Sequence, residues 1–236
     1  MSNPDELSTT RQGQLQRLAE LVRDLHQLTP PEGLLDELTE GAVQWVPGAQ
    51  YAGITVTRRR SDIETAAATG SYPLILDDIQ RRHREGPCLS AAWAHQTIRI
   101  DDLAVDDRWP RYCADAIAQT PIRSMLCFQL FGQDQAVGAL NFFSEGINVF
   151  DNESVELGLV FATHAALVWN MQRRDEQFRS ALASRDIIGQ AKGMLMERYR
   201  IDAVAAFDLL RRLSQESNVP LAQIAQQVVH ADHPSH

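Results

Sequence analysis

The chain has 236 residues, and its 31 acidic residues outnumber its 22 lysines and arginines, which gives a formal net charge of −9. This length fits one large or two modest domains, and the acidic balance argues against a chain built throughout for nucleic acid. No apolar run approaches the roughly 18 residues that a membrane span needs. The sequence also does not open with charged residues followed by an apolar run, the pattern of a secretory signal peptide. We therefore expect a cytoplasmic protein that does not enter a membrane.

The first two thirds of the sequence alternate between helical and strand patterns. After a disordered segment at 1–13, we expect helices at 14–28, 32–45, 74–84, 88–95 and 109–118, and strands at 51–57, 62–68, 97–100, 122–131 and 135–143. The arginine run at 58–61 is expected to form a solvated hairpin tip. This order of elements predicts an α+β fold in which an antiparallel sheet carries helices on its faces.

A long helix is predicted from Asp151, a suitable N-cap, because no proline occurs again before Pro220. Apolar residues follow spacings of four and three along this helix, as in a coiled coil. We assign this dimer seam to Leu157, Phe161, Val168, Met171, Phe178 and Leu182, joined by Leu15, Leu18, Val22 and Leu25 of the 14–28 helix. The seam predicts a homodimer. His164 and Asp175 interrupt it, and they either fix its register or face solvent.

The last part of the chain is predicted to be all-helical. The long helix ends near 198–200, a second helix begins at its cap Asp202, and a third follows Asn218 with Pro220 in its first turn, before a tail at 231–236. Its predicted core consists of Ile188, Ala191, Leu195, Phe207, Leu210, Leu213, Leu221, Ile224 and Val228. A three-helix module this short is marginal alone, so we expect it to depend on the dimeric coiled coil.

Positive charge is distributed unevenly along the chain. Residues 1–179 carry 16 arginines against 25 acidic residues, whereas residues 180–236 carry six cations and six acidic residues. The balanced C-terminal segment therefore permits a phosphate partner. It also holds Lys192, the single lysine of the chain. A compact ammonium group beside Gly193 suggests a position where a generic positive charge does not suffice.

Catalytic and metal-binding patterns are absent from the sequence. Cys88, Cys113 and Cys127 are odd in number and widely spaced, so they indicate neither a disulfide framework nor a metal site. We expect each to be a small buried group. No Gly-rich phosphate loop and no Ser-His-Asp arrangement can be argued. The sequence therefore predicts a protein that is not an enzyme.

Several motifs in the first two thirds resemble the GAF domain. They are Gly86 to Leu89, Arg99 to Leu103, Asp106 to Pro110 and Val137 to Phe142. The resemblance spans roughly 14–172 and is specific for the fold. It implies a sensor domain that receives a signal, for example a small-molecule ligand in the GAF pocket, but no particular cofactor, because this fold hosts many different ligands.

Residues 180–229 resemble the ANTAR domain of transcription antitermination regulators, and we place the domain at 173–230. The matching stretches are Ser184-Arg185, Ile188 to Gly193, Leu195-Met196, Ala206-Phe207, Leu209-Leu210 and Ser214 to Asn218, closed by Leu221, Ala225 and Val228-Val229. The resemblance implies binding of paired hexaloop hairpins in RNA. It also implies that binding stabilises an antiterminator, so that polymerase reads through a terminator.

The candidate RNA-binding residues are Arg185, Gln190, Lys192, Gly193, Arg211, Arg212, Ser214 and Asn218. Arg185 and Lys192 lie seven residues apart on one helix face, and Gly193 keeps that face low enough for a phosphate or a base to approach. Structural alternatives stay open for several of these residues. They are close helix packing for Gly193, stabilisation of a helix C-terminus for the two arginines of the second helix, and a helix cap for Asn218.

The segment after Asn218 lacks the basic residue that relatives place near the start of the last helix. We therefore expect RNA affinity to be lower, or to depend on two subunits that engage two hairpins. Two other classes of protein are alternatives: a GAF-based thiol reductase of free methionine sulfoxide, and a DNA-binding or protein-docking regulator. Duplex DNA is not the expected partner, because no recognition helix stands out.

Overall fold

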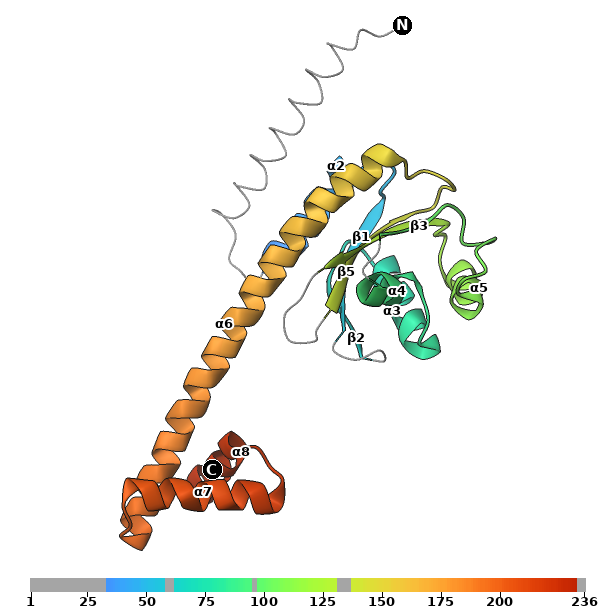
Figure 1. The fold of residues 1–236 in the computed structure, drawn as a ribbon. Helices are drawn as coiled ribbons and strands as arrows, with labels where there is room; N and C mark the ends of the chain where they lie inside the picture. Colours follow the sequence, from blue (N-terminus) through green and yellow to red (C-terminus); the bar gives the residue numbers. More distant parts are fainter. Residues whose placement is uncertain (1–32, 58–61, 95–96, 131–136, 233–236) are drawn as a thin grey trace, which may run out of the picture. The chain divides into compact units, whose positions relative to one another are not determined.

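An antiparallel sheet forms the centre of the N-terminal part of the chain in the computed structural model (Figure 1). The structure describes residues 33–57, 62–94, 97–130 and 137–232. The chain divides into unit 1, Met1–Gln172, and unit 2, Arg173–His236. The predictions for 1–28, for the hairpin tip at 58–61 and for 233–236 lie outside the described residues, and so do Leu15, Leu18, Val22 and Leu25 of the predicted seam.

The described strands of unit 1 form one sheet in the order β2-β1-β5-β4-β3, with every neighbouring pair antiparallel. The strands are β1 (Tyr51–Thr57), β2 (Ile63–Ala68), β3 (Ile98–Ile100), β4 (Ser124–Leu130) and β5 (Val137–Ser144). The helices are α2 (Leu34–Trp45), α3 (Tyr72–His83), α4 (Pro87–Ala94), α5 (Pro110–Gln119) and the first part of α6 (Asn152–Tyr199). The predicted α+β fold class is confirmed.

Each face of the sheet has its own core, because successive side chains of a strand point to opposite faces. Phe142 of β5 packs with residues of α2 and α6, whereas its neighbour Phe143 packs with residues of α3, α4 and α5. Figure 1 shows α2 and α6 on one side of the sheet and the other three helices on the opposite side. Unit 1 is therefore a sheet that is covered by helices on both faces.

The beginning of α6 is fixed by a cap and by a close contact with the sheet. The predicted N-cap is confirmed, because the Ser154 N–H donates to Asp151 Oδ1 at 2.9 Å. Further along the helix, a Cβ at Gly158 would overlap the ring of Phe128 and would lie in tight contact with the ring of Phe142. Glycine at this position lets the helix backbone lie directly on the aromatic rings of the sheet.

Two residues that we assign to the dimer seam from the sequence belong to the core of unit 1. Phe161 and Val168 are buried within the cluster that α6 shares with the sheet and α2. Their assignment to a contact with a second subunit is wrong, because a buried side chain offers no surface to a partner. Met171, Phe178 and Leu182 are exposed. Leu157, also assigned to the seam, is half-buried against the same core.

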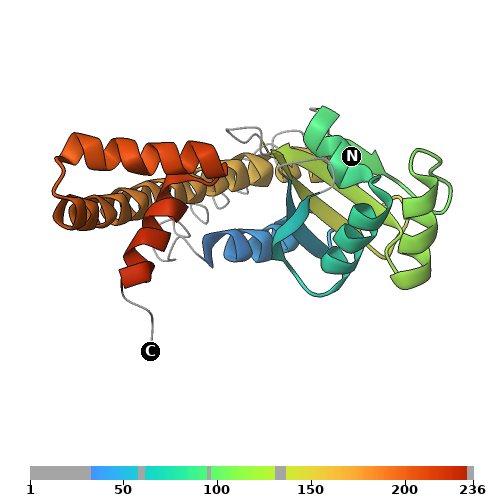
Figure 2. The same ribbon diagram turned by 90° about the horizontal axis from the view of Figure 1, so that it is seen from below.

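Unit 2 contains the second part of α6, followed by α7 (Ala203–Ser217) and α8 (Leu221–Asp232) (Figure 2). Asp202 caps α7 as predicted, since its Oδ1 accepts from the N–H groups of Val204 at 3.0 Å and Ala205 at 2.8 Å. Pro220 precedes α8 rather than lying in its first turn, and α8 continues into the predicted tail as far as Asp232.

The core of unit 2 differs in part from its prediction. Its buried residues are Ala191, Leu195, Ala206, Leu210, Ile224 and Ala225. Phe207 and Leu213, which the sequence predicts in this core, are exposed instead. The spacing of apolar residues does not show which side of α7 is buried. Ala206 and Leu210 form the buried face, and Phe207 and Leu213 lie outside it.

Candidate nucleic-acid interface

The second part of α6 presents several candidate RNA-binding side chains to solvent. Arg185 and Gln190 are exposed and Lys192 is half-buried. Ala191, between Gln190 and Lys192, is fully buried in the core of unit 2, so the core fixes the rotation of the helix about its axis. Arg185 and Lys192 are thereby held seven residues apart on the accessible side of α6, as predicted.

Two glycines leave the surface of α6 open beside these cations. A Cβ at Gly189 or Gly193 would have no atom within 4 Å, so no described residue packs against either position. Close helix packing therefore does not explain Gly193 within the described part of the chain. Glycine in a helix interior costs about 1 kcal/mol relative to alanine. Sequence reasoning missed Gly189, although its spacing of four from Gly193 places both on one face.

Helix α7 adds two exposed arginines, Arg211 and Arg212. The last turn of α7 contains no basic residue, and the effect of the helix dipole fades beyond that turn. Stabilisation of the helix C-terminus therefore does not account for them. Arg211 pairs with Asp208 at 3.0 Å, but an exposed ion pair of this kind contributes little and can be exchanged for a phosphate.

Ser214 and Asn218 hold the turn that ends α7. The Ser214 hydroxyl donates to the Val219 carbonyl oxygen at 2.6 Å. Asn218 is the C-cap in the left-handed conformation, with φ of 54°, and its N–H donates to the Ser214 carbonyl oxygen. Asparagine tolerates this conformation better than most residues. The structure thus supports the capping alternative for Asn218 and gives Ser214 a role in the same turn.

A buried polar cluster in unit 1 was missed by sequence reasoning. Asp77 of α3 accepts hydrogen bonds from the hydroxyls of Thr55 at 2.8 Å and Thr65 at 2.7 Å, and from the Gln80 amide at 3.2 Å. Burial raises the pKa of Asp77 to about 6, although the hydrogen bonds from Thr65, Thr55 and Gln80 and the charge of Arg81 lower it. The pair Asp77-Asp78 resembles a solvated helix face in sequence, and only the tertiary contacts show that its first member is buried.

The cluster connects α3 to α4 and to the middle of the sheet. Gln80 Oε1 accepts from the N–H groups of Cys88 at 3.0 Å and Leu89 at 3.3 Å, in the first turn of α4. On the other side, the Asn141 amide donates to Thr55 Oγ1 at 2.9 Å. The second amide atom, Asn141 Oδ1, is buried and has no hydrogen-bond partner among the described residues. Buried polar atoms without partners are rare in proteins.

The three cysteines do not favour a thiol enzyme. All three are buried. Burial raises the pKa of Cys113 to about 11 and that of Cys88 well above its usual value. A nucleophilic cysteine needs a lowered pKa and access to its substrate. Burial denies access to all three side chains, and the pKa of Cys88 and that of Cys113 are raised rather than lowered.

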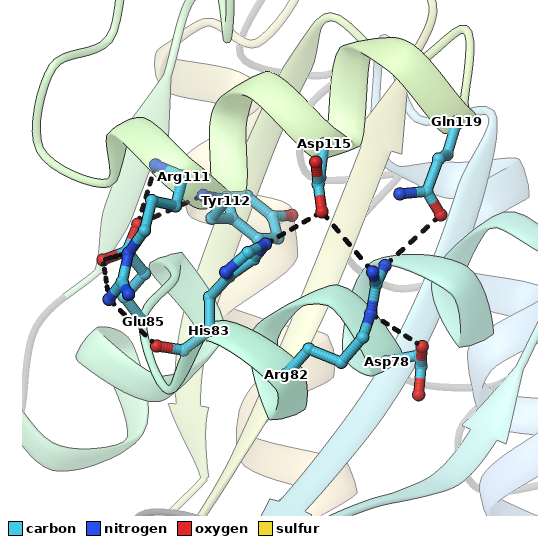
Figure 3. Close-up of polar contacts among 8 residues, drawn as sticks. All are labelled: Asp78, Arg82, His83, Glu85, Arg111, Tyr112, Asp115 and Gln119. Carbon is cyan, nitrogen blue, oxygen red and sulfur yellow. Dashed lines mark hydrogen bonds and ion pairs between the residues drawn. The ribbon is translucent and has the colours of Figure 1, made fainter.

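The outer side of α3 and α5 carries ion pairs that join the two helices (Figure 3). His83 Nε2 and Asp115 Oδ2 lie 2.8 Å apart. Glu85 accepts from the N–H groups of Arg111 at 2.8 Å and Tyr112 at 3.1 Å, which satisfies donors that a helix N-terminus otherwise leaves free. The charges on this surface are paired with one another, so it links two helices rather than offering a site for an anion.

Unit 1 matches a known domain family in sequence and in fold. The GAF domain matches residues 29–170, which is more than half of the chain. The chain belongs to the GAF domain family. The ANTAR domain matches residues 176–229. The order of a GAF domain followed by an ANTAR domain is that of a regulator with a sensory domain and an RNA-binding output.

Solved GAF domains share the fold at low sequence identity. A GAF domain from Pseudomonas syringae pv. tomato has a TM-score of 0.53 and 19% identity, covering 76% of this chain and 99% of its own. The GAF domain of a phosphoenolpyruvate-protein phosphotransferase from Coxiella burnetii has a TM-score of 0.54 and 14% identity, covering 70% of this chain and 96% of its own. Comparison with curated proteins finds no match. None of the described helices is long and apolar enough to cross a membrane.

Proposed function

We propose that the ANTAR domain binds paired hexaloop hairpins in nascent RNA and thereby controls transcription termination, in response to a signal received by the GAF domain. The observation that supports this most is the open surface of α6 at Gly189 and Gly193, flanked by Arg185 and Lys192. Proteins recognise RNA loops through shape, phosphate contacts and unstacked bases. A low helix surface beside two cations can accept a base and hold the adjoining phosphates.

The arginines of α7 provide the second group of phosphate contacts in this proposal. Arg211 and Arg212 are exposed, and the ion pair of Arg211 with Asp208 is also on the surface. Gln190 is exposed and lies three residues before Gly193, so it borders the open surface of α6 and can donate to a loop base. We assign Ser214 and Asn218 to the turn after α7, because their polar groups already serve it.

We further propose that α6 pairs with α6 of a second copy of the chain. Large apolar side chains of this helix are exposed at Leu167, Met171, Phe178 and Leu182, at spacings of four, seven and four. These spacings repeat on one helix side, and a row of exposed apolar residues marks a contact surface. Two copies would bring two ANTAR domains to two linked hairpins, which raises affinity without any new contact.

The test is binding of the full chain to a paired-hexaloop hairpin RNA across a range of salt concentrations. Lys192→Ala and Arg185→Ala are each expected to weaken binding about tenfold and to lower the salt slope by about one, because each removes one phosphate contact. Arg174→Ala is the matched control, since Arg174 is an exposed arginine on the same helix but lies before Arg185. Its binding should equal that of wild type.

Two results would contradict the proposed function. One is wild-type binding with no preference for the hairpins over an unstructured RNA of equal length. The other is wild-type affinity in both the Lys192→Ala and the Arg185→Ala chain. Competition by duplex DNA as effective as competition by the hairpin RNA would favour the DNA-binding alternative instead.

A further inference from the structure

Asp77 is the only buried aspartate, glutamate, lysine or arginine among the described residues. It lies between α3, which carries it, and the edge strand β2, whose Thr65 hydroxyl donates to its Oδ2 at 2.7 Å. A buried carboxyl without a paired cation at contact distance shifts toward its protonated form, because burial disfavours the charge. The carboxyl of Asp77 can therefore be either ionised or protonated in the folded chain.

The hydrogen-bond partners allow both states of the carboxyl. The ionised form accepts from Thr55, Thr65 and Gln80, as the structure shows. The protonated form needs one acceptor, and Thr65 Oγ1 is already at hydrogen-bond distance from Oδ2. Thr65 is half-buried on the edge strand, so its own hydroxyl can turn away to water when it accepts from the acid. Neither state leaves a carboxyl oxygen or proton without a partner.

The other groups around the carboxyl do not compete for the proton. Arg81 of α3 favours the ionised form through its charge and donates to the Ile63 carbonyl oxygen of β2 at 3.2 Å. Cys88 of α4 and Tyr112 of α5 also face this region, and burial raises the pKa of both well above their usual values, so they stay neutral. The sheet strands β1, β2 and β5 contribute only the neutral Thr55, Thr65 and Asn141.

We propose that Asp77 is a proton-binding site of the GAF domain, and that its proton changes the link between α3 and the edge strand β2. A proton taken up from water protonates the carboxylate, and the new O–H donates to Thr65 Oγ1. The hydrogen bond between Asp77 and Thr65 reverses direction, and the Thr65 hydroxyl turns to solvent. Because the ligand is a proton, the site needs no cavity. The proposal does not depend on the proposed RNA binding.

The test is a carbon-13 NMR titration of the full chain with labelled aspartate carboxyls. The signal that disappears in Asp77→Asn belongs to Asp77, and its midpoint is expected at about 6 rather than at the ordinary 3.8. Thr65→Val removes both the donor to the ionised carboxylate and the acceptor of the protonated one. Because the hydrogen bond to the charged form is the stronger of the two, the midpoint should shift to higher pH by a few tenths of a unit or more, on the order of a twofold or larger gain in proton affinity. Asp36→Asn changes an exposed aspartate of α2 and should leave the midpoint unchanged.

A midpoint nearer to 3.8 than to 6 would overturn the proposal. A midpoint near 6 that Thr65→Val does not move would overturn the role of the edge strand. If Asp77→Asn fails to fold, the signal of Asp77 is assigned instead as the one that shifts in Thr65→Val and stays in place in Asp36→Asn. In that case the absence of any such signal would count against the proposal.

Discussion

The GAF and ANTAR units bury different kinds of core. In unit 1 the largest fully buried side chains include Phe128, Phe142, Phe143, Phe150 and Phe161, which come from both faces of the sheet, from α6 and from the segment that precedes α6. In the described part of unit 2, three of the six buried core residues are alanines, which bury little apolar area. The difference shows that one helix has two roles. In unit 1, α6 adds the large ring of Phe161 to the core, whereas in unit 2 it adds Ala191 and Leu195 and leaves its surface at Gly189 and Gly193 without contacts among the described residues.

A substitution in the core of unit 1 should destabilise that unit without destabilising unit 2. Phe161→Ala removes a fully buried ring and should lower the free energy of unfolding of unit 1 by roughly 3–5 kcal/mol. All four tryptophans precede residue 173, so denaturant unfolding followed by tryptophan fluorescence reports on unit 1. Leu210→Ala in the core of unit 2 should leave that fluorescence transition in place, and an equal shift in both variants would contradict the separation of the two cores.

The buried acid of unit 1 should make its stability depend on pH. The folded chain holds the proton of Asp77 more tightly than the unfolded chain, because the pKa is raised to about 6 from 3.8. Stability from this group is therefore present at low pH and is lost as pH rises between these two values. The asparagine of the Asp77→Asn variant does not titrate, so its stability lacks this dependence on pH. Above about pH 6 the free energy of unfolding of wild type should therefore have decreased relative to that of the variant by up to about 3 kcal/mol. Urea unfolding at several pH values measures this difference, and parallel curves for the two chains would contradict it.

Glycines on the same helix should respond in opposite ways in the two units. Gly158→Ala places a methyl group against the rings of Phe128 and Phe142, and overpacking of this kind costs about 1–3 kcal/mol. The measurement is the tryptophan-monitored unfolding transition, which should move to lower denaturant. A transition at the wild-type position would show that α6 can move away from the sheet at no cost.

The open glycines of unit 2 should give the smallest effect, with the opposite sign. Gly189→Ala and Gly193→Ala meet no atom within 4 Å, so each should stabilise the helix by about 1 kcal/mol. Thermal unfolding followed by circular dichroism tests this. A loss of stability in either variant would mean that something packs against the glycine, for example α6 of a second copy.

Much of the fold could be predicted because it follows from local patterns. The bounds of β1 match the alternating segment at 51–57, and the length of α6 follows from the absence of proline between Asp151 and Pro220. The caps Asp151 and Asp202 were also predictable, because a short acidic side chain before an apolar helix satisfies its first N–H groups.

Other features depend on what lies across the helix, which a local pattern does not show. Phe161 and Val168 have the spacing of a dimer seam, but the chain's own sheet buries them. Phe207 and Leu213 are as apolar as the core residues of unit 2, but the buried face of α7 is formed by Ala206 and Leu210. Asp77 looks solvated beside Asp78 until Thr55 and Thr65 of the sheet are brought to it.

The most direct test of the RNA interface is the affinity of Gly193→Leu for the paired-hairpin RNA. Leucine adds bulk to the open surface of α6 without changing its charge, and its helix propensity is higher than that of glycine. Ala183→Leu is the control, because it adds bulk at an exposed position of the same helix. An open RNA-binding surface predicts about tenfold weaker binding for Gly193→Leu, roughly 1.4 kcal/mol, with the control unchanged and both chains folded. Wild-type affinity in a folded Gly193→Leu chain would contradict it.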